Sequence, residues 1–485
     1  MLARLNESLL ADVLQWLDWP DLLAADSAAT AKSFRAHWLL AVSRLNVEAS
    51  LGRLWKQWGK EWNCAFSWVC SREIWLPKEI KFPDRADNAE TGRLALAGPK
   101  AGRVKLIRFN LHGKEGISID FLEPLVGLEH LVLECCWKLT DADLFKLQPL
   151  VALKHLELES CAMVTNLRSI SSLVSLEQLA LTNCNKFNDS TLLGLQPLTN
   201  LQRLHLQAYS DRKLSIAGVA HIATLTQLRV LNLGCSTITD AALAPISALK
   251  SLTELHIIER DPLCTTKVTG TVLEHLKKLP LTAISLCCKA TDAGLAALRY
   301  FPGLKDFKLW DAEDVTDEGL QHFRHFTCLE RLDLCSCPGI TDAAFQHMAG
   351  FSCLKKLSLD YSEITGVGLA HLARSASTLT ELDLSDSPVN DAGLVHIGEL
   401  TALRLLGLGA QEDNYDQVTD AGLAHLHALK ELRSIWLSSL TAVSKAAAEA
   451  LIDHCPHLER ILLPESCFKD EVFKLQLRER RVECR

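Results

Sequence analysis

Long hydrophobic runs, an excess of basic residues and Cys-x-x-Cys motifs are all missing from this chain of 485 residues. No apolar stretch approaches the roughly 20 residues that a transmembrane helix needs. The formal net charge is −8 and both signs are interspersed, which is not the pattern of a nucleic-acid or membrane binder. Glu7, Asp12 and Asp18 interrupt the first apolar residues, so we expect no secretory signal.

Cysteine is abundant, at 17 residues, but its arrangement does not suit metal binding. Close pairs such as Cys135–Cys136 fit tetrahedral zinc poorly, so we expect neither a metal nor a cofactor. Four cysteines instead lie three residues after the last leucine of a repeated phrase: Cys136, Cys161, Cys184 and Cys337. This register predicts a ladder of buried, reduced thiols. Reduced thiols favour a cytoplasmic or nuclear location.

The repeated phrase is leucine, two variable residues, leucine, one variable residue and leucine. It recurs fifteen times, at spacings of about 22 to 30 residues, which is the period of a solenoid whose units bury their apolar faces against their neighbours. In residues 327–351 the phrase predicts a short strand, and Phe345 and Met348 belong to one apolar helical stripe. Pairs such as Thr341–Asp342 precede the expected helices, and we interpret both members as helix caps, not as catalytic residues.

The coincidence of strand, cysteine and helix-start positions resembles the cysteine-containing class of leucine-rich repeats, over roughly residues 103–463. The resemblance implies an α/β solenoid of the horseshoe type, with parallel strands on the concave face and helices on the convex face. Residues 103–485 would form this solenoid with its C-terminal cap.

The outward strand positions form the candidate target-binding surface. Trp310, with Lys308 and Arg331, is the preferred contact centre, because tryptophan and arginine are frequent anchors of protein interfaces. Trp436 and Arg203 complete the candidate set. Alternatively, either tryptophan packs on a neighbouring strand or loop. No Ser-His-Asp, paired-carboxylate or glycine-rich phosphate constellation stands out on this face.

Three longer connections offer an alternative binding surface along one edge. They are residues 207–215, 259–269 and 409–419. Insertions on one edge of a solenoid often mark its binding face. The alternative is tolerated drift, because lengthening a surface loop costs little.

The first hundred residues form a different unit, without the leucine phrase. Eight of the 11 tryptophans lie within residues 16–75. Residues 46–102 are expected to hold an amphipathic helix and a connector that caps the solenoid.

Residues 1–45 resemble an F-box, the helical motif that docks onto the Skp-type adaptor of cullin ubiquitin ligases. The second helix would start at Asp21, and a Ser33-Phe34-Arg35 element follows, although Asn6 stands where the family usually has proline. The resemblance implies adaptor contacts from Leu5, Leu9, Leu10, Val13, Leu14, Leu17 and Leu22. Alternatively, this segment is only a helical cap that seals the open end of the solenoid.

These resemblances imply a non-enzymatic substrate receptor, acting as a monomer within a hetero-complex. It would hold an unidentified target protein near the ubiquitin-conjugating enzyme and so raise the effective concentration of the target's lysines. The alternative is a leucine-rich-repeat scaffold or regulator without a ubiquitin link, for example a bacterial effector in the host cytosol. An intrinsic ligase is not expected, because only about 22 residues follow Leu463, too few for a catalytic domain.

Overall fold

The computed structural model describes the strand residues 79–81 and 106–110, most of residues 119–464, residue 467 and residues 482–484. Gaps within this range fall at residues 120–121, 124, 185–187, 209–213, 236–237, 259–266, 288, 410–416 and 439. The chain divides into two units, Met1–Arg212 and Lys213–Arg485, and each is described by itself. The expected domain boundaries at residues 45 and 102, and the adaptor-contact leucines and valine, lie outside the described residues.

In the first unit, successive strands pair in parallel, and equivalent leucines such as Leu131, Leu156 and Leu179 align across the sheet. The strands are β1 (Glu79–Lys81), β2 (Leu106–Asn110), β3 (His130–Glu134), β4 (His155–Glu159), β5 (Gln178–Thr182) and β6 (Arg203–Ala208). Short helices follow them: α6 (Asp141–Leu144), η4 (Phe145–Leu147), η5 (Leu167–Ile170), α7 (Asp189–Leu192) and η6 (Leu193–Leu195).

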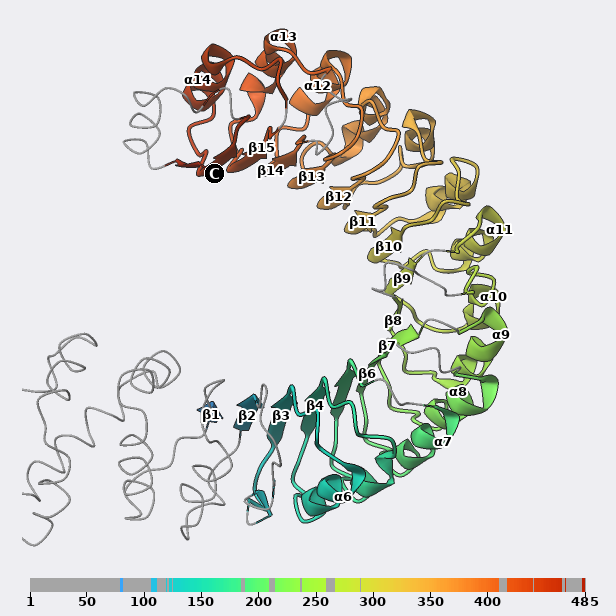
Figure 1. Cartoon of the computed structure of the whole chain (residues 1–485). Coiled ribbons are helices and arrows are strands. Elements are labelled where there is room, and N and C mark those ends of the chain that lie inside the picture. The colour runs from blue at the N-terminus through green and yellow to red at the C-terminus, as the bar shows by residue number, and fades with distance from the viewer. Residues whose placement is uncertain are drawn as a thin grey trace, which may run out of the picture. The chain divides into compact units, whose positions relative to one another are not determined.

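The second unit repeats this plan, with parallel strands along the inner side of an arc and helices along the outer side (Figure 1). Its strands are β7 (Val230–Cys235), β8 (Glu254–Ile257), β9 (Ala283–Cys287), β10 (Asp306–Trp310), β11 (Arg331–Asp333), β12 (Lys356–Ser358), β13 (Glu381–Asp383), β14 (Leu405–Gly407), β15 (Ser434–Trp436), β16 (Arg460–Leu462) and β17 (Glu483–Cys484).

The outer side of the second unit consists of short α-helices and 3-10 turns. They are α8 (Ile216–Ile222), α9 (Asp240–Leu243), η7 (Ala244–Ala248), α10 (Leu273–Leu276), α11 (Asp292–Leu295), η8 (Ala296–Tyr300), η9 (Gly319–His325), η10 (Asp342–His347), η11 (Val367–Ser375), α12 (Asp391–Gly398), α13 (Asp420–Leu423), η13 (Ala424–Ala428) and α14 (Lys445–His454). A single turn is the usual length because each helix only has to cover one repeat.

The core lies between strands and helices and is built by the leucine phrase. Leu329, Leu332 and Leu334 are at most 1% exposed, and residues between them face outward. Burying each such leucine contributes about 2 kcal/mol, and only the neighbouring repeats supply the covering surface. The fold is therefore a leucine-rich-repeat solenoid, which confirms the predicted fold class.

The predicted cysteine ladder is also present. Cys136, Cys161 and Cys184 are free and at most 2% exposed. The Cys161 thiol donates to the Leu133 carbonyl oxygen at 3.8 Å, one repeat earlier. A hydrogen bond with Cys136 raises the pKa of Cys161, so the thiol stays protonated and acts as a small apolar group.

The paired helix-start residues have two different roles. Thr341 caps its own helix, because its Oγ1 accepts from the Ala343 amide at 3.2 Å. Asp317 instead reaches into the next repeat, where it accepts from the Thr341 amide at 2.8 Å and from Thr341 Oγ1 at 2.6 Å. Asp292 holds Thr316 in the same way. The interpretation of the aspartates as helix caps was therefore wrong, since they join consecutive repeats.

We expect Asp317→Ala to lower the free energy of unfolding of the second unit by about 2 kcal/mol, because it removes two charge-assisted hydrogen bonds between repeats. Urea unfolding followed by circular dichroism measures the change. Asp314→Ala is the matched control, since Asp314 is exposed on the same connection. Equal midpoints for the two variants would contradict the inter-repeat role.

Candidate protein-binding surface

The candidate surface, here called the central concave surface, consists of the outward side chains of β10–β13. Strand pairing places Asp306, Arg331, Lys356 and Glu381 in one row across the four strands. A second row, two residues further along, contains Lys308, Asp333, Ser358 and Asp383. Each row contains charges of both signs, because each strand contributes a different residue to the same repeat position.

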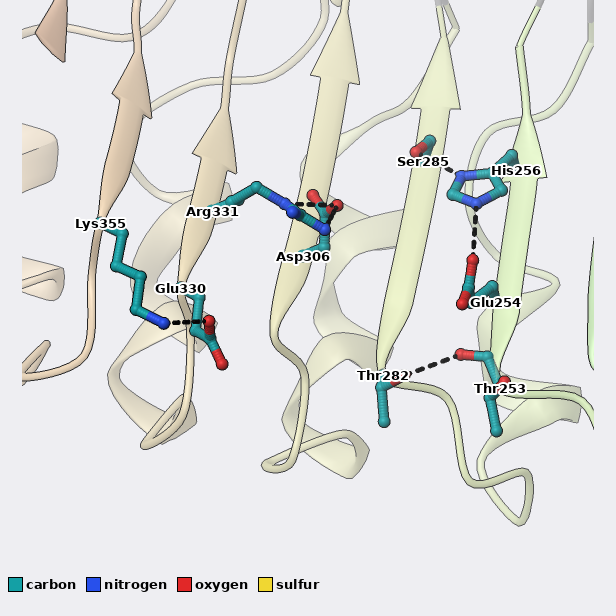
Figure 2. Close-up of polar contacts among 9 residues, drawn as sticks. All are labelled: Thr253, Glu254, His256, Thr282, Ser285, Asp306, Glu330, Arg331 and Lys355. Atoms are coloured by element: carbon teal, nitrogen blue, oxygen red, sulfur yellow. Dashed lines mark hydrogen bonds and ion pairs between the residues drawn. The ribbon is translucent and has the colours of Figure 1, made fainter. Parts of the chain in front are cut away.

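The three residues of the predicted contact centre lie on adjacent strands. The Lys308 ammonium is 5.7 Å from the centroid of the half-buried Trp310 ring, within the range of a cation–π contact. On the next strand, Arg331 pairs with Asp306 through Nη2 at 2.7 Å and Nε at 2.9 Å (Figure 2). The Arg331 side chain is nevertheless 56% exposed. Lys308 and Trp310 therefore meet, whereas Arg331 lies opposite Asp306, four residues before Trp310 in the strand register.

Beyond Lys308, the second row carries two aspartates, and Asp360 follows two residues after Ser358. Burial raises the pKa of Asp333, although a hydrogen bond from Trp310 partly offsets it. Burial likewise raises the pKa of Asp383. Asp360 accepts hydrogen bonds from the Cys335 thiol at 3.1 Å and from Ser358 Oγ at 2.9 Å. These carboxyl groups accept hydrogen bonds from neutral donors.

The two other predicted target-binding residues lie elsewhere. Trp436 is half-buried on β15 and pairs in register with Gly407 of β14. A Cβ at residue 407 would lie 2.3 Å from Asp383 Oδ1, so the neighbouring side chain leans over this glycine. Trp310 and Trp436 are five strands apart in the sheet and do not form one centre. Arg203 is exposed on β6 of the first unit.

Glu254, His256 and Ser285 form a polar line that the sequence pattern did not predict. His256 Nδ1 lies 2.8 Å from Ser285 Oγ, and His256 Nε2 lies 3.8 Å from Glu254 Oε2 (Figure 2). Burial lowers the pKa of His256. The serine is 1% exposed, however, so its hydroxyl cannot meet an acyl substrate. The strand register that pairs His256 with Ser285 was the signal that could have found this contact.

The alternative edge surface stays a prediction. The central parts of its three connections, residues 209–213, 259–266 and 410–416, lie outside the described residues. Within the described part of the chain, no group of three or more His, Cys, Asp or Glu residues is placed to hold a metal ion. No helix in that part has the length and apolar character needed to cross a bilayer.

No protein-family model and no curated protein matches the chain. Among solved structures, it is similar to an internalin (InlF) from Listeria monocytogenes, at 20% identity over 71% of this chain and 88% of that chain, with a TM-score of 0.43. It is also similar to the yeast Rad7 and Elc1 complex, at 16% identity over 86% of this chain and 91% of that chain, with a TM-score of 0.47. Scores this low carry no argument about function.

Proposed function

We propose that this protein is a substrate receptor of a cullin-type ubiquitin ligase. Residues 1–45 bind a Skp-type adaptor, and the solenoid holds the target protein on its outward strand face. The receptor itself performs no chemistry, and it acts by positioning target lysines near the conjugating enzyme. It works as a monomer within a hetero-complex in the cytoplasm or nucleus.

The observation that carries the binding role is the contact centre on β10 and β11. Trp310 offers a large, half-buried ring that is held between Lys308 and Asp333. Arg331 is already oriented by its pair with Asp306. Side chains that are ordered before binding lose little conformational entropy on binding, and tryptophan and arginine are the residues that dominate interface energetics. The ubiquitin link rests on the F-box resemblance of residues 1–45.

The adaptor role predicts that Leu9→Glu combined with Val13→Glu abolishes capture of the full-length protein by a eukaryotic Skp adaptor. The two substitutions would bury carboxylates without partners in the apolar adaptor interface, and the cost of removing these charges from water prevents docking. A pull-down with purified proteins measures capture, and a variant lacking residues 1–45 is the reference for complete loss.

Circular dichroism has to show that the solenoid stays folded in each variant. Undiminished capture by the double variant, or no capture of the wild-type protein, would overturn the ubiquitin link. The protein would then be a free-standing leucine-rich-repeat scaffold or regulator, with residues 1–45 as its cap, and a bacterial effector in a host cytosol is one form of that alternative.

The contact centre predicts that Trp310→Ala weakens binding of the captured target by about 30-fold, the effect of about 2 kcal/mol expected for an interface anchor. Arg331→Glu should weaken it further, because it breaks the pair with Asp306 and adds negative charge. Titration calorimetry measures the affinities. Val367→Ala, an exposed change at a residue of η11 on the outer side, is the control. Unchanged affinity in both test variants would move the site to the edge connections.

A further inference from the structure

Two exposed thiols occupy equivalent positions in consecutive repeats of the second unit. Cys328 directly precedes Leu329, and Cys353 directly precedes Leu354. Both cysteines are exposed, whereas the other cysteines whose side chains the structure describes are buried or half-buried. Gly303 occupies the same position in the preceding repeat, so only these two neighbouring repeats bring thiols to the same edge of the sheet.

The backbone has the same conformation around both thiols. The amide of Phe326 donates to the Phe323 carbonyl oxygen at 2.9 Å. The equivalent amide of Phe351 donates to the Met348 carbonyl oxygen at 3.0 Å. The leucine after each cysteine is at most 1% exposed. The backbone at Cys353 therefore repeats the backbone at Cys328, displaced by one repeat along the solenoid.

Their side chains also have matching neighbours. Cys328 Sγ lies 3.6 Å from Thr327 Oγ1, and Cys353 Sγ lies 3.9 Å from Ser352 Oγ. Each thiol thus lies near the hydroxyl of the residue before it, which indicates the same orientation in both repeats.

The distance between the repeats suits a disulfide. Two residues further along, the Lys355 and Lys356 amides donate to the Glu330 carbonyl oxygen at 2.8 and 3.1 Å. Strands joined in this way lie roughly 5 Å apart, within the Cα separations of about 4.4 to 6.8 Å that disulfides accept. The Glu330 and Lys355 side chains, which also occupy equivalent positions, form an ion pair at 2.6 Å (Figure 2). Equivalent side chains of these two repeats can therefore meet.

We propose that Cys328 and Cys353 form a redox-active dithiol that closes to a disulfide between the two repeats. The co-reactant is a small-molecule disulfide, such as oxidised glutathione. The thiolate of one cysteine attacks it and releases one glutathione thiol, and the second thiolate then attacks the mixed disulfide and releases the other. Both cysteines are oxidised, the two electrons reduce the oxidant to two thiols, and the cysteine protons pass to the leaving thiolates.

The buried cysteines do not compete in this reaction. Burial raises the pKa of Cys337 to about 12, and the residue is 0% exposed. The pair therefore reacts in a folded chain while the internal ladder stays reduced. Closure links β11 to β12, which carry Arg331 and Lys356 of the central concave surface. This inference does not depend on the proposed ubiquitin link.

The test treats the folded, full-length protein with oxidised glutathione and determines the intact mass and the non-reduced peptide map. The expected result is a monomer that has lost two hydrogens, carries no glutathione at this position and yields one cross-linked peptide joining Cys328 to Cys353. Cys328→Ser and Cys353→Ser should each retain a stable glutathione adduct on the remaining thiol.

The matched control is the double variant Cys353→Ser, Thr378→Cys, which moves the second thiol one repeat further along the same edge. Its two thiols lie roughly 10 Å apart, beyond disulfide reach, so both should carry glutathione. The proposal is overturned if the wild-type protein carries glutathione on both cysteines, if the bridge joins two molecules, or if the control pair closes equally well.

Discussion

Gly294→Ala is expected to destabilise the second unit by about 3 kcal/mol, at the upper end of the effects of overpacking. A Cβ at residue 294 would lie 1.8 Å from the Thr269 carbonyl oxygen and 3.1 Å from Gly270 Cα. Both obstacles are backbone atoms of the neighbouring repeat, so relief requires the two repeats to separate. The same close approach at Gly393, 2.2 Å from the Thr365 carbonyl oxygen, explains why glycine recurs after the helix-start pair.

Urea unfolding of the full-length protein, followed by circular dichroism, measures the effect. Gly303→Ala is the matched control, because nothing lies within 4 Å of a Cβ built at that residue. We expect the control to unfold within about 0.5 kcal/mol of the wild-type protein, the range of a surface change. A Gly294→Ala variant as stable as this control would show that the repeats are not packed as closely as the structure describes.

Phe323→Ala is expected to cost about 3 to 5 kcal/mol, because it leaves a cavity in the core of the second unit. Phe323 is 0% exposed, and its ring centroid lies 5.4 Å from that of Phe307 and 5.1 Å from that of Phe326. The three rings join β10 to the helix of the same repeat and to the turn after it. Truncation removes the edge-to-face contact with Phe307 as well as buried area.

The same urea-unfolding measurement can rank the losses of stability of three variants. Phe323→Leu keeps most of the apolar volume and should fall between the alanine variant and the wild-type protein. Tyr300→Ala removes an aromatic ring that is 39% exposed, and should cost less than about 1 kcal/mol. If Phe323→Ala were no worse than Tyr300→Ala, the aromatic cluster would not be part of the core.

The repeat made most of the fold predictable. In a solenoid each unit contacts only its neighbours, so one period of sequence encodes both the local element and its tertiary partner. The inward leucines, the cysteine ladder and the threonine caps follow directly from this, and all three are present. The outward positions of Lys308, Trp310 and Arg331 on adjacent strands followed as well, while their role in target binding stays a prediction.

The contacts between repeats could not be assigned in the same way. The sequence pattern predicts Asp317 to be a helix cap. Its carboxylate instead accepts a hydrogen bond from the Thr341 amide, which the next repeat places within reach. His256 and Ser285 meet across a long connection that conceals their common register. Such choices depend on side-chain rotamers and on the separation of two backbones, which a linear pattern does not contain.

The sequence by itself determined the period, the strand and helix positions, the buried leucines and cysteines, and the set of outward residues, since all of these depend on local spacing and burial. Only the tertiary structure decided which outward residues are neutralised by partners and which glycines lie against a neighbouring carbonyl. These properties arise from distances of a few ångströms between residues that lie a full repeat apart in the chain.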